Sequence, residues 1–327
     1  MSTRFRIADV VVLAAAALLC SASALSQTYP ERPIRVIVPY PAGGGIDVMA
    51  RVLGEELGKR WGHGFVVENK PGGSTIPAAS EVARATPDGY TLLLTTDSTM
   101  SVNPYLFAKL PYDPVKDFAP ITQLLFLNQL LLAHPSVPAN NLKELVALAK
   151  EKPGTMNYAS YGSGSQPHLA METFKQQAGI DIVHIPYKGI PQAVPAAIAG
   201  EVQFTFSGAA SSQGQIKAGR LKPLAIGGDR RLALLPDVPT FTEQGYPGVP
   251  ANAWFGFFAP AGTPPAIIEK LQREIAAILV SPAFKAKEID AKGYDPVGST
   301  PAQFAAFLRE DSERSARAVK ISGAKAE

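Results

Sequence analysis

The chain has 327 residues, of which 46% are hydrophobic and 18% are charged, and its formal net charge is +3. This composition is typical of a globular protein of about two domains and excludes an intrinsically disordered chain. The 31 basic residues form no dense run, which excludes the electrostatic footprint of a nucleic-acid-binding protein. The single cysteine excludes an intrachain disulfide framework and a multi-cysteine metal site.

The N-terminus has the features of an export signal. Arg4 and Arg6 precede an unbroken apolar run at 10–19, and small residues at 22–24 occupy the cleavage position. The alternative is a membrane anchor, but this run is too short to cross about 30 Å of hydrocarbon. We therefore expect an exported, periplasmic protein.

We expect the signal peptide to comprise residues 1–26, with cleavage after Ala24 or after Ser26. Cys20 allows the alternative of a lipoprotein. Leu19 is larger than the small residue that normally precedes a lipidated cysteine, so this alternative is disfavoured. Cleavage also removes the only cysteine.

Short apolar runs and amphipathic patterns alternate along the rest of the chain. This alternation indicates βαβ units and a mostly parallel sheet, and hence an α/β fold. We expect strands at 34–40, 65–67, 90–95, 121–133, 155–159, 182–186, 202–206 and 221–226, and helices that include 48–57, 76–85, 167–178, 267–278 and 301–308. Residues 71–73 read as a turn.

Two helix starts have clear caps. Asn141 with Glu144 has capping-box spacing, and Thr300 with Gln303 has the same spacing, with Pro301 as a first-turn proline. We expect a helix to begin at each of these positions.

The first of two glycine-rich turns between a strand and a helix is Pro41-Ala42-Gly43-Gly44-Gly45, with Asp47 just inside the helix. Glycines let backbone N–H groups point into one concavity, and a helix N-terminus adds partial positive charge. Such a turn is suited to a small anion, a carboxylate in particular. It could equally be only a tight connection.

The second glycine-rich turn is Ser160-Tyr161-Gly162-Ser163-Gly164-Ser165, where hydroxyls accompany the free N–H groups. The same two interpretations apply to it. Neither turn has the third glycine of a dinucleotide fingerprint, and the chain contains no G-K-[ST] motif. Nucleotide binding is therefore disfavoured.

No catalytic or metal-ligand motif is visible, so we expect no enzyme activity and no cofactor. The four histidines show no short ligand spacing, although His168 follows the second turn and could approach a bound anion. Tyr187 and Lys188 follow an expected strand, and the lysine is either a ligand cation or a solvated charge. Trp254-Phe255 either lines a cleft or belongs to the core.

Several long motifs resemble the Bug-type solute receptors of tripartite tricarboxylate transporters, in order and over essentially the whole mature chain. The motifs are YPERPIRVIVPYPAGGGIDVMAR (29–51), VVENKPGG (66–73), ARATPDGYTLLL (83–94), NPYLFAKLPYDPVKDFAPI (103–121), NYASYGSGSQPHLAMETFK (157–175), HIPYKG (184–189), LLPDVPTFTEQGYPG (234–248) and FFAPAGTP (257–264).

The resemblance implies a two-lobed receptor that closes on a small organic acid and presents it to membrane permease subunits. Lobe one would comprise residues 27–128 plus 248–327, and lobe two residues 129–247. Each lobe would be a mostly parallel sheet flanked by helices, with the ligand between them, in a monomer. The implied ligand residues are Tyr40, Ala42, Gly43, Gly44, Gly45 and Asp47 in the first turn, Ser160, Gly162, Ser163, Gly164 and Ser165 in the second, and Thr96, Asp97, Ser98 and Ser207 elsewhere; our own reading of the residues adds His168, Tyr187 and Lys188.

Two departures leave the substrate open. The family often has Phe at the position of Tyr40. It also often has an acidic or amide residue after the strand expected at 202–206, where this chain has Ser207-Gly208-Ala209. A module that feeds a signalling partner instead of a permease is a second interpretation. An exported enzyme on the same scaffold is a third.

Overall fold

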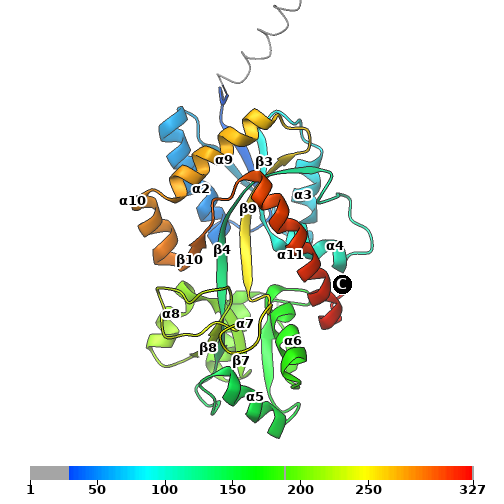
Figure 1. Cartoon of the computed structure of the whole chain (residues 1–327), viewed down its shortest axis with the longest axis vertical. Coiled ribbons are helices and arrows are strands. Elements are labelled where there is room, and N and C mark those ends of the chain that lie inside the picture. Colours follow the sequence, from blue (N-terminus) through cyan, green and yellow to red (C-terminus); the bar gives the residue numbers. More distant parts are fainter. Residues whose placement is uncertain (1–28, 188, 326–327) are drawn as a thin grey trace, which may run out of the picture.

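The computed structural model describes residues 29–187 and 189–325. The expected signal peptide and Lys188 lie outside these residues. The described residues form two lobes, one above the other in Figure 1, each with a sheet covered by helices. The two-lobed α/β architecture is confirmed.

Lobe one begins with βαβ units. β1 (Ile34–Val38) pairs in parallel with β2 (Phe65–Asn69) and with β3 (Thr91–Thr96). The helices α2 (Gly45–Trp61) and α3 (Ile76–Ala83) connect these strands. This part agrees with the expected parallel pattern.

Three further strands complete the sheet of lobe one, and all are antiparallel to their neighbours. β9 (Asn252–Pro260) pairs with β3, β4 (Phe118–Ala133) pairs with β9, and β10 (Tyr294–Pro296) pairs with β4. The sheet is therefore mixed, and the expectation of a mostly parallel sheet needs correction outside the βαβ units. The long strands β4 and β9 run between the lobes (Figure 1), which is why their direction does not follow the βαβ pattern.

In lobe two, β5 (Asn157–Ser160) pairs in parallel with β6 (Val183–Pro186) and β7 (Phe204–Gly208). β7 and β8 (Lys222–Ile226) pair antiparallel with β4. The helices are α5 (Leu142–Glu151), α6 (Gln166–Ala178), α7 (Ile190–Ala199) and α8 (Ala209–Lys217). This sheet is mixed for the same reason.

β4 joins the two sheets. It pairs with β9 as far as Asn128, opposite Asn252, and with β7 from Gln129, opposite Gly208. The division into residues 27–128 plus 248–327 and residues 129–247 remains a prediction, and we use the two lobe names in that sense.

The remaining elements belong to lobe one. They are the 3-10 helices η1 (Gly73–Thr75) and η4 (Asp290–Lys292), the π-helices η2 (Ser98–Val102) and η3 (Lys285–Ile289), and the α-helices α4 (Asn103–Leu106), α9 (Pro265–Leu279), α10 (Pro282–Phe284) and α11 (Pro301–Ser322). The Thr300 capping box is confirmed at the start of α11, and the Asn141 side chain accepts from the Glu144 amide at the start of α5.

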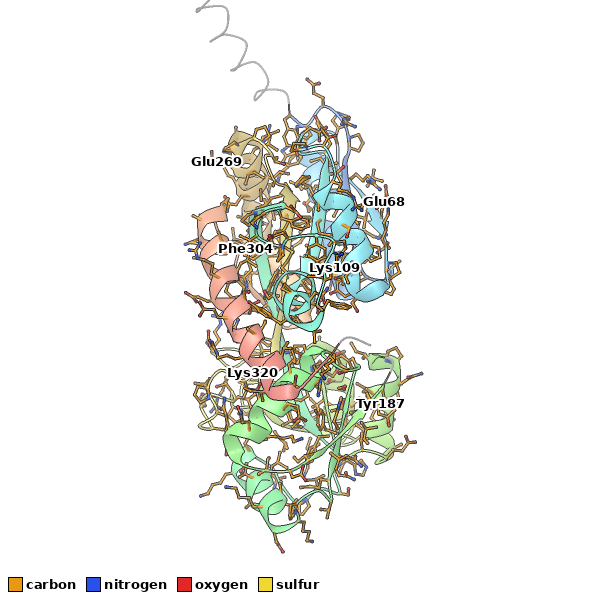
Figure 2. The ribbon with its side chains drawn as sticks, turned by 90° about the vertical axis from the view of Figure 1, so that its right-hand side faces the viewer. Glu68, Lys109, Tyr187, Glu269, Phe304 and Lys320 are labelled. Atoms are coloured by element: carbon orange, nitrogen blue, oxygen red, sulfur yellow. The ribbon has the colours of Figure 1, made fainter. Side chains whose placement is uncertain are left out.

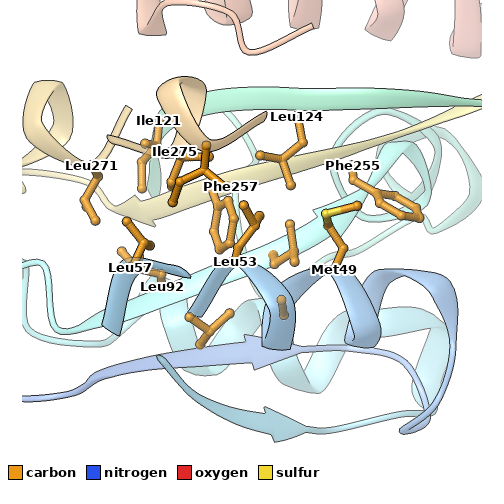
Figure 3. Close-up of a cluster of buried hydrophobic side chains, with 14 of the residues drawn as sticks. Met49, Leu53, Leu57, Leu92, Ile121, Leu124, Phe255, Phe257, Leu271 and Ile275 are labelled. Atoms are coloured by element: carbon orange, nitrogen blue, oxygen red, sulfur yellow. The ribbon is translucent and has the colours of Figure 1, made fainter. Parts of the chain in front are cut away.

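A buried apolar cluster holds α2 against the sheet of lobe one (Figure 3). Met49, Leu53 and Leu57 recur at helical spacing and are fully buried, and Phe257 of β9 lies among them. Burial of each such side chain contributes about 1.5–3 kcal/mol. This packing fixes the N-terminus of α2, which carries the first glycine turn.

The helix α11 extends from lobe one toward lobe two. In Figure 2, Phe304 near its start lies in the upper lobe, and Lys320 near its end lies at the level of the lower lobe. There Ala318 and Val319 share a buried cluster with Leu169 of α6. The lobes are thus connected by packing as well as by strands.

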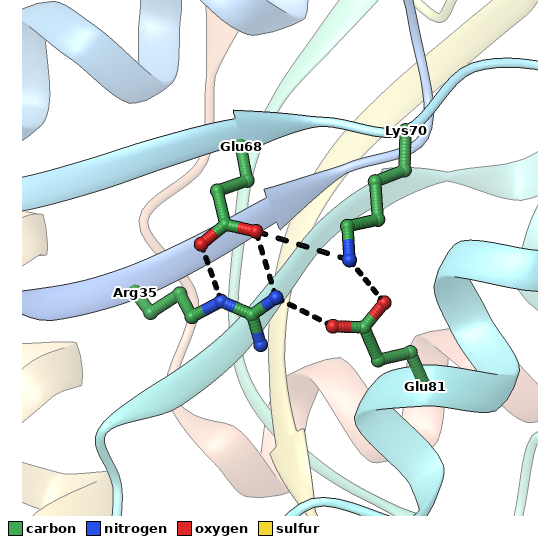
Figure 4. Close-up of polar contacts among 4 residues, drawn as sticks. All are labelled: Arg35, Glu68, Lys70 and Glu81. Carbon is green, nitrogen blue, oxygen red and sulfur yellow. Dashed lines mark hydrogen bonds and ion pairs between the residues drawn. The ribbon is translucent and has the colours of Figure 1, made fainter.

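An ionic network ties α3 to the edge of the sheet (Figure 4). Arg35 binds Glu68 at 2.5 Å and Glu81 at 2.5 Å, and Lys70 pairs with both glutamates. Hydrogen bonding to Arg35 lowers the pKa of Glu68, and hydrogen bonding to Lys70 lowers that of Glu81. All four side chains are about one third exposed, so the network mainly orients the loop between β2 and α3.

Candidate functional site

The predicted ligand segments follow the carboxyl ends of β1, β3, β5 and β7, where open α/β sheets bind ligands. These ends face the boundary between the lobes. At Gly164, after β5, an added Cβ would lie 2.6 Å from Leu106 Cδ1 of α4. The second glycine turn therefore lies directly against lobe one.

The first glycine turn is exposed from Pro41 to Gly45. Gly43 has a φ of 83°, a conformation that favours glycine, and Gly44 caps α2 with an extended backbone. The amides of Gly44, Gly45 and Ile46 donate to no acceptor among the described residues, as is usual for a first helical turn. These free donors at the positive end of a helix can hold an anion.

Asp47 has all its hydrogen-bonding capacity directed to the protein. Its carboxylate accepts from the Gly43 amide (2.8 Å), Arg51 Nε (3.0 Å) and Asn69 Nδ2 (2.9 Å). Burial acts to raise the pKa of Asp47, but these hydrogen bonds lower it overall. Asp47, 2% exposed, therefore fixes the shape of the turn, and its direct contact with a ligand stays a prediction.

Tyr40, Thr96, Asp97 and Ser98 come together after β1 and β3. The Tyr40 hydroxyl lies 2.7 Å from Thr96 Oγ1, and the Ser98 amide donates to the same oxygen. Burial, followed by the charge of Asp311, raises the pKa of Asp97 to about 7. A protonated Asp97 can donate to a carboxylate, whereas its ionised form repels one.

Most hydroxyls of the second glycine turn bond within the turn. Ser165 Oγ donates to the Gly162 carbonyl (2.6 Å), and Ser160 Oγ accepts from the Gly162 amide (3.1 Å). Ser163 is exposed, and its hydroxyl has no partner among the described residues. Of the three serines, Ser163 is the one that is free to meet a ligand.

Two histidines, His168 and His184, hydrogen-bond to residues of this turn. Their rings stack with centroids 4.1 Å apart. His168 Nδ1 accepts from the Gly164 amide (3.1 Å), and His184 Nε2 lies 2.6 Å from Ser160 Oγ. Burial lowers the pKa of His168 and also that of His184, the latter to about 4. His168 is therefore a neutral residue that positions Gly164, and its approach to a bound anion stays a prediction.

The other predicted residues have different surroundings. Ser207 Oγ lies 3.2 Å from Ser211 Oγ, at the junction of β7 and α8. Tyr187 borders the second turn, because its amide donates to the Ser160 carbonyl (3.1 Å). Trp254 and Phe255 are buried, which settles the alternative in favour of the core.

A cavity of about 560 Å³ is lined by residues of the second turn and by residues of lobe one. The first turn does not line it, so the two glycine turns do not share this cavity. Its lining residues are Gly73, Ser74, Ile76, Pro77, Leu106, Phe107, Gly162, Ser163 and Lys325. Sequence reasoning had identified only Gly162 and Ser163.

The loop that ends at Thr75 is a third glycine turn between a strand and a helix. Ser74 and Thr75 have φ values of 50° and 72°, which are uncommon for residues with side chains. Asn103 Nδ2 holds the loop by donating to the Ser74 carbonyl (2.7 Å). The signal for this loop was the pair Gly72-Gly73 between β2 and α3, which we interpreted only as a turn.

Within residues 29–187 and 189–325, no cluster of three or more potential metal ligands occurs. In the same part of the chain, no helix is both long and apolar enough to cross a membrane. The groups gathered around the strand ends are hydroxyls, amides and one perturbed carboxyl, a set suited to hydrogen bonding with an oxyanion.

Residues 49–323 match the model of the tripartite tricarboxylate transporter family receptor. The chain belongs to this receptor family. Among curated relatives, BugT of Bordetella pertussis is 37% identical over 316 residues, with 96% of each chain covered. The family match and the similar fold of the periplasmic binding protein BugD (32% identical, TM-score 0.75, covering 91% of this chain and 100% of that chain) confirm the resemblance.

Two solved structures of similar fold contain carboxylates. An R. palustris protein with adipate is 31% identical, with a TM-score of 0.79 and coverage of 91% of this chain and 99% of that chain. MatC from Rhodopseudomonas palustris, with bound malate, is 31% identical, with a TM-score of 0.74 and coverage of 89% and 100%. Both support the α/β receptor fold.

Proposed function

We propose that this chain is a periplasmic receptor that binds a small organic acid between its lobes and delivers it to the permease subunits of a tripartite tricarboxylate transporter. The observation that carries the proposal is the first glycine turn, whose free amides of Gly44 and Gly45 face solvent at the N-terminus of α2. The adipate and malate of two relatives are of the ligand class that such donors suit.

In this proposal the ligand meets the two glycine turns from opposite sides. The first turn supplies amides, Ser163 supplies a hydroxyl, and Asp97 in its protonated form supplies a further donor. Asp47 and His168 hold these donors in place. Neither a metal nor an organic cofactor takes part, and the receptor acts as a monomer.

Titration calorimetry with acetate, malate, adipate and citrate, supported by melting curves, tests the proposal. At about 100 times its dissociation constant, a true ligand adds about 2.7 kcal/mol to the free energy of unfolding. We expect at least one of the acids to bind, to bind equally in the presence of a chelator, and to be recovered unchanged. Binding only of neutral sugars or cations would refute the proposal.

Delivery and location have their own tests. Deletion of the gene should abolish uptake of the acid that binds, whereas a change in gene expression with uptake unaffected would indicate a signalling role. N-terminal sequencing of exported protein should give a start between Leu25 and Gln27. Protein that retains Met1, or that begins at an acylated Cys20, would contradict release into the periplasm.

A further inference from the structure

The hydroxyl of Tyr294 lies beside the first glycine turn. Tyr294 begins β10 and pairs with Leu127 of β4, next to the point where β4 changes sheets. A Cβ on Gly45 would lie 2.6 Å from the Tyr294 hydroxyl oxygen, which is closer than these atoms can pack. Gly45 is helical and has no positive φ, so its backbone does not require glycine. A side chain at position 45 would therefore require the Tyr294 hydroxyl to move.

The Tyr294 ring is fixed, but its hydroxyl is unpaired. The ring packs against Phe255 with centroids 5.9 Å apart. The hydroxyl makes no hydrogen bond with any described residue, although tyrosine hydroxyls in such partly buried places usually have a partner. Burial, and then the charge of Glu288, raises the pKa of Tyr294, so the hydroxyl keeps its proton at neutral pH.

The residues on both sides of Tyr294 reach lobe two. A Cβ on Gly293 would lie 3.4 Å from Ala209 Cβ, at the start of α8, and Asp295 forms an ion pair with Arg230. Tyr294 therefore lies at the boundary between the two lobes. Its hydroxyl lies on the lobe one side, beside the free amide of Gly45.

We propose that Tyr294 is a ligand-binding residue whose hydroxyl donates a hydrogen bond to the carboxylate oxygen held by the first glycine turn. The inference rests on the proposed function and adds a donor from a third segment of the chain. Gly45 contributes by leaving the space that the hydroxyl occupies. Selectivity among carboxylates then depends on whether one oxygen can reach the amide and the phenol together.

Calorimetry on Tyr294→Phe, with the tightest-binding acid among acetate, malate, adipate and citrate, tests the inference. Loss of a hydrogen bond to a charged group should weaken binding by about 10- to 150-fold. Tyr105→Phe is the matched control, because it removes a phenol hydroxyl that bonds Ser312 elsewhere in lobe one. It should bind as the wild type does.

A double-mutant cycle with Gly45→Ala links the two residues. Gly45→Ala should weaken binding in the wild-type background, because the new methyl group displaces the hydroxyl, and should cost much less in the Tyr294→Phe background. Wild-type affinity of Tyr294→Phe, or equal costs in both backgrounds, would overturn the inference and leave the proposed function standing. Failure of the wild type to bind any of the acids would refute the proposed function, and the inference with it.

Discussion

Asp47 and Asp97 show how neighbouring side chains determine the pKa, and hence the role, of a buried carboxyl group. Both are buried, at 2% and 8% exposure. Asp47 accepts hydrogen bonds from Arg51 and Asn69 and remains ionised, whereas Asp97 has Asp311 nearby and a raised pKa of about 7. The first residue is a structural brace, and the second can change its charge near neutral pH.

We expect carboxylate affinity to rise as pH falls from 8 to 6, because Asp97 gains a proton over this interval and stops repelling the ligand. If only the protonated form binds, the gain is about 10-fold. Calorimetry in Asp97→Asn should show a much flatter profile. A wild-type affinity that is constant from pH 8 to pH 6 would exclude Asp97 from the site.

The same pKa shift affects stability with a definite sign. The folded state holds the Asp97 proton more tightly than the unfolded chain, so the free energy of unfolding falls as pH rises from 3.8 to about 7. Asp97→Asn should therefore gain stability relative to the wild type at pH 8, and less at pH 4. The neutral histidines His168 and His184 act in the opposite direction below pH 6.5. Melting curves of both proteins at both pH values isolate the Asp97 contribution.

Two serines of the second turn should separate binding from stability. Ser163→Ala removes the free hydroxyl and should weaken binding by about 5- to 150-fold without a change in melting temperature. Ser165→Ala breaks the bond to the Gly162 carbonyl and should cost about 0.5–1.5 kcal/mol of stability.

Calorimetry and melting curves measure both serine variants, and His63→Ala, which lies beyond the far end of α2, is the control. Wild-type affinity in Ser163→Ala would show that the second turn is only a connection.

At the scale of elements, local sequence predicts the strands up to β8 and the helices that have clear start signals, but not α7 and α8. Asn141 and Thr300 predicted two helix starts, because a cap depends on residues three positions apart. β9 was not predicted, since Trp254 and Phe255 are explained by neighbours on β3 and β4 far away in the sequence. The mixed direction of both sheets is a tertiary property of the same kind.

The candidate site, like the secondary-structure elements, could be predicted only where it depends on a local sequence pattern. The glycine turns at 41–45 and 160–165 could be recognised, because glycines between a strand and a helix form a local pattern. The hydrogen bonds of Asp47 and the ring stacking of His168 could not, since both residues lie on helices and their partners Asn69 and His184 lie on separate strands. Gly45 and Tyr294 are separated by even more of the chain, so their proximity could not be predicted either.

We expect Asp47→Ala to loosen the start of α2. The variant leaves the Gly43 amide and Asn69 without their acceptor, which should lower the free energy of unfolding by about 1.5–3 kcal/mol and weaken binding. Urea unfolding measures the loss. Glu55→Ala, which removes an exposed pair with Lys59 on the same helix, should cost under about 1 kcal/mol. Equal costs would contradict the bracing role of Asp47.

At the scale of the molecule, we expect the lobes to close on the ligand. A ligand that bridges both glycine turns binds the closed state more tightly and shifts the population toward it. Small-angle scattering should show a smaller radius of gyration in the presence of the acid that binds. An unchanged radius at saturation would mean that the site lies within one lobe or is already formed.

The pairing of Asn128 with Asn252 has a consequence for how such receptors diversify. In the predicted division, lobe two is an insertion at 129–247 whose entry and exit lie side by side, so we expect that recombination between genes can exchange it as a cassette. The contact between the lobes is not limited to the strands β4 and β9, however, because Ala318 and Val319 of α11 pack on Leu169. A stable chimera with a new lobe two therefore also needs an α11 whose C-terminal end packs on that lobe. We expect exchanges that change ligand specificity to include the C-terminal helix.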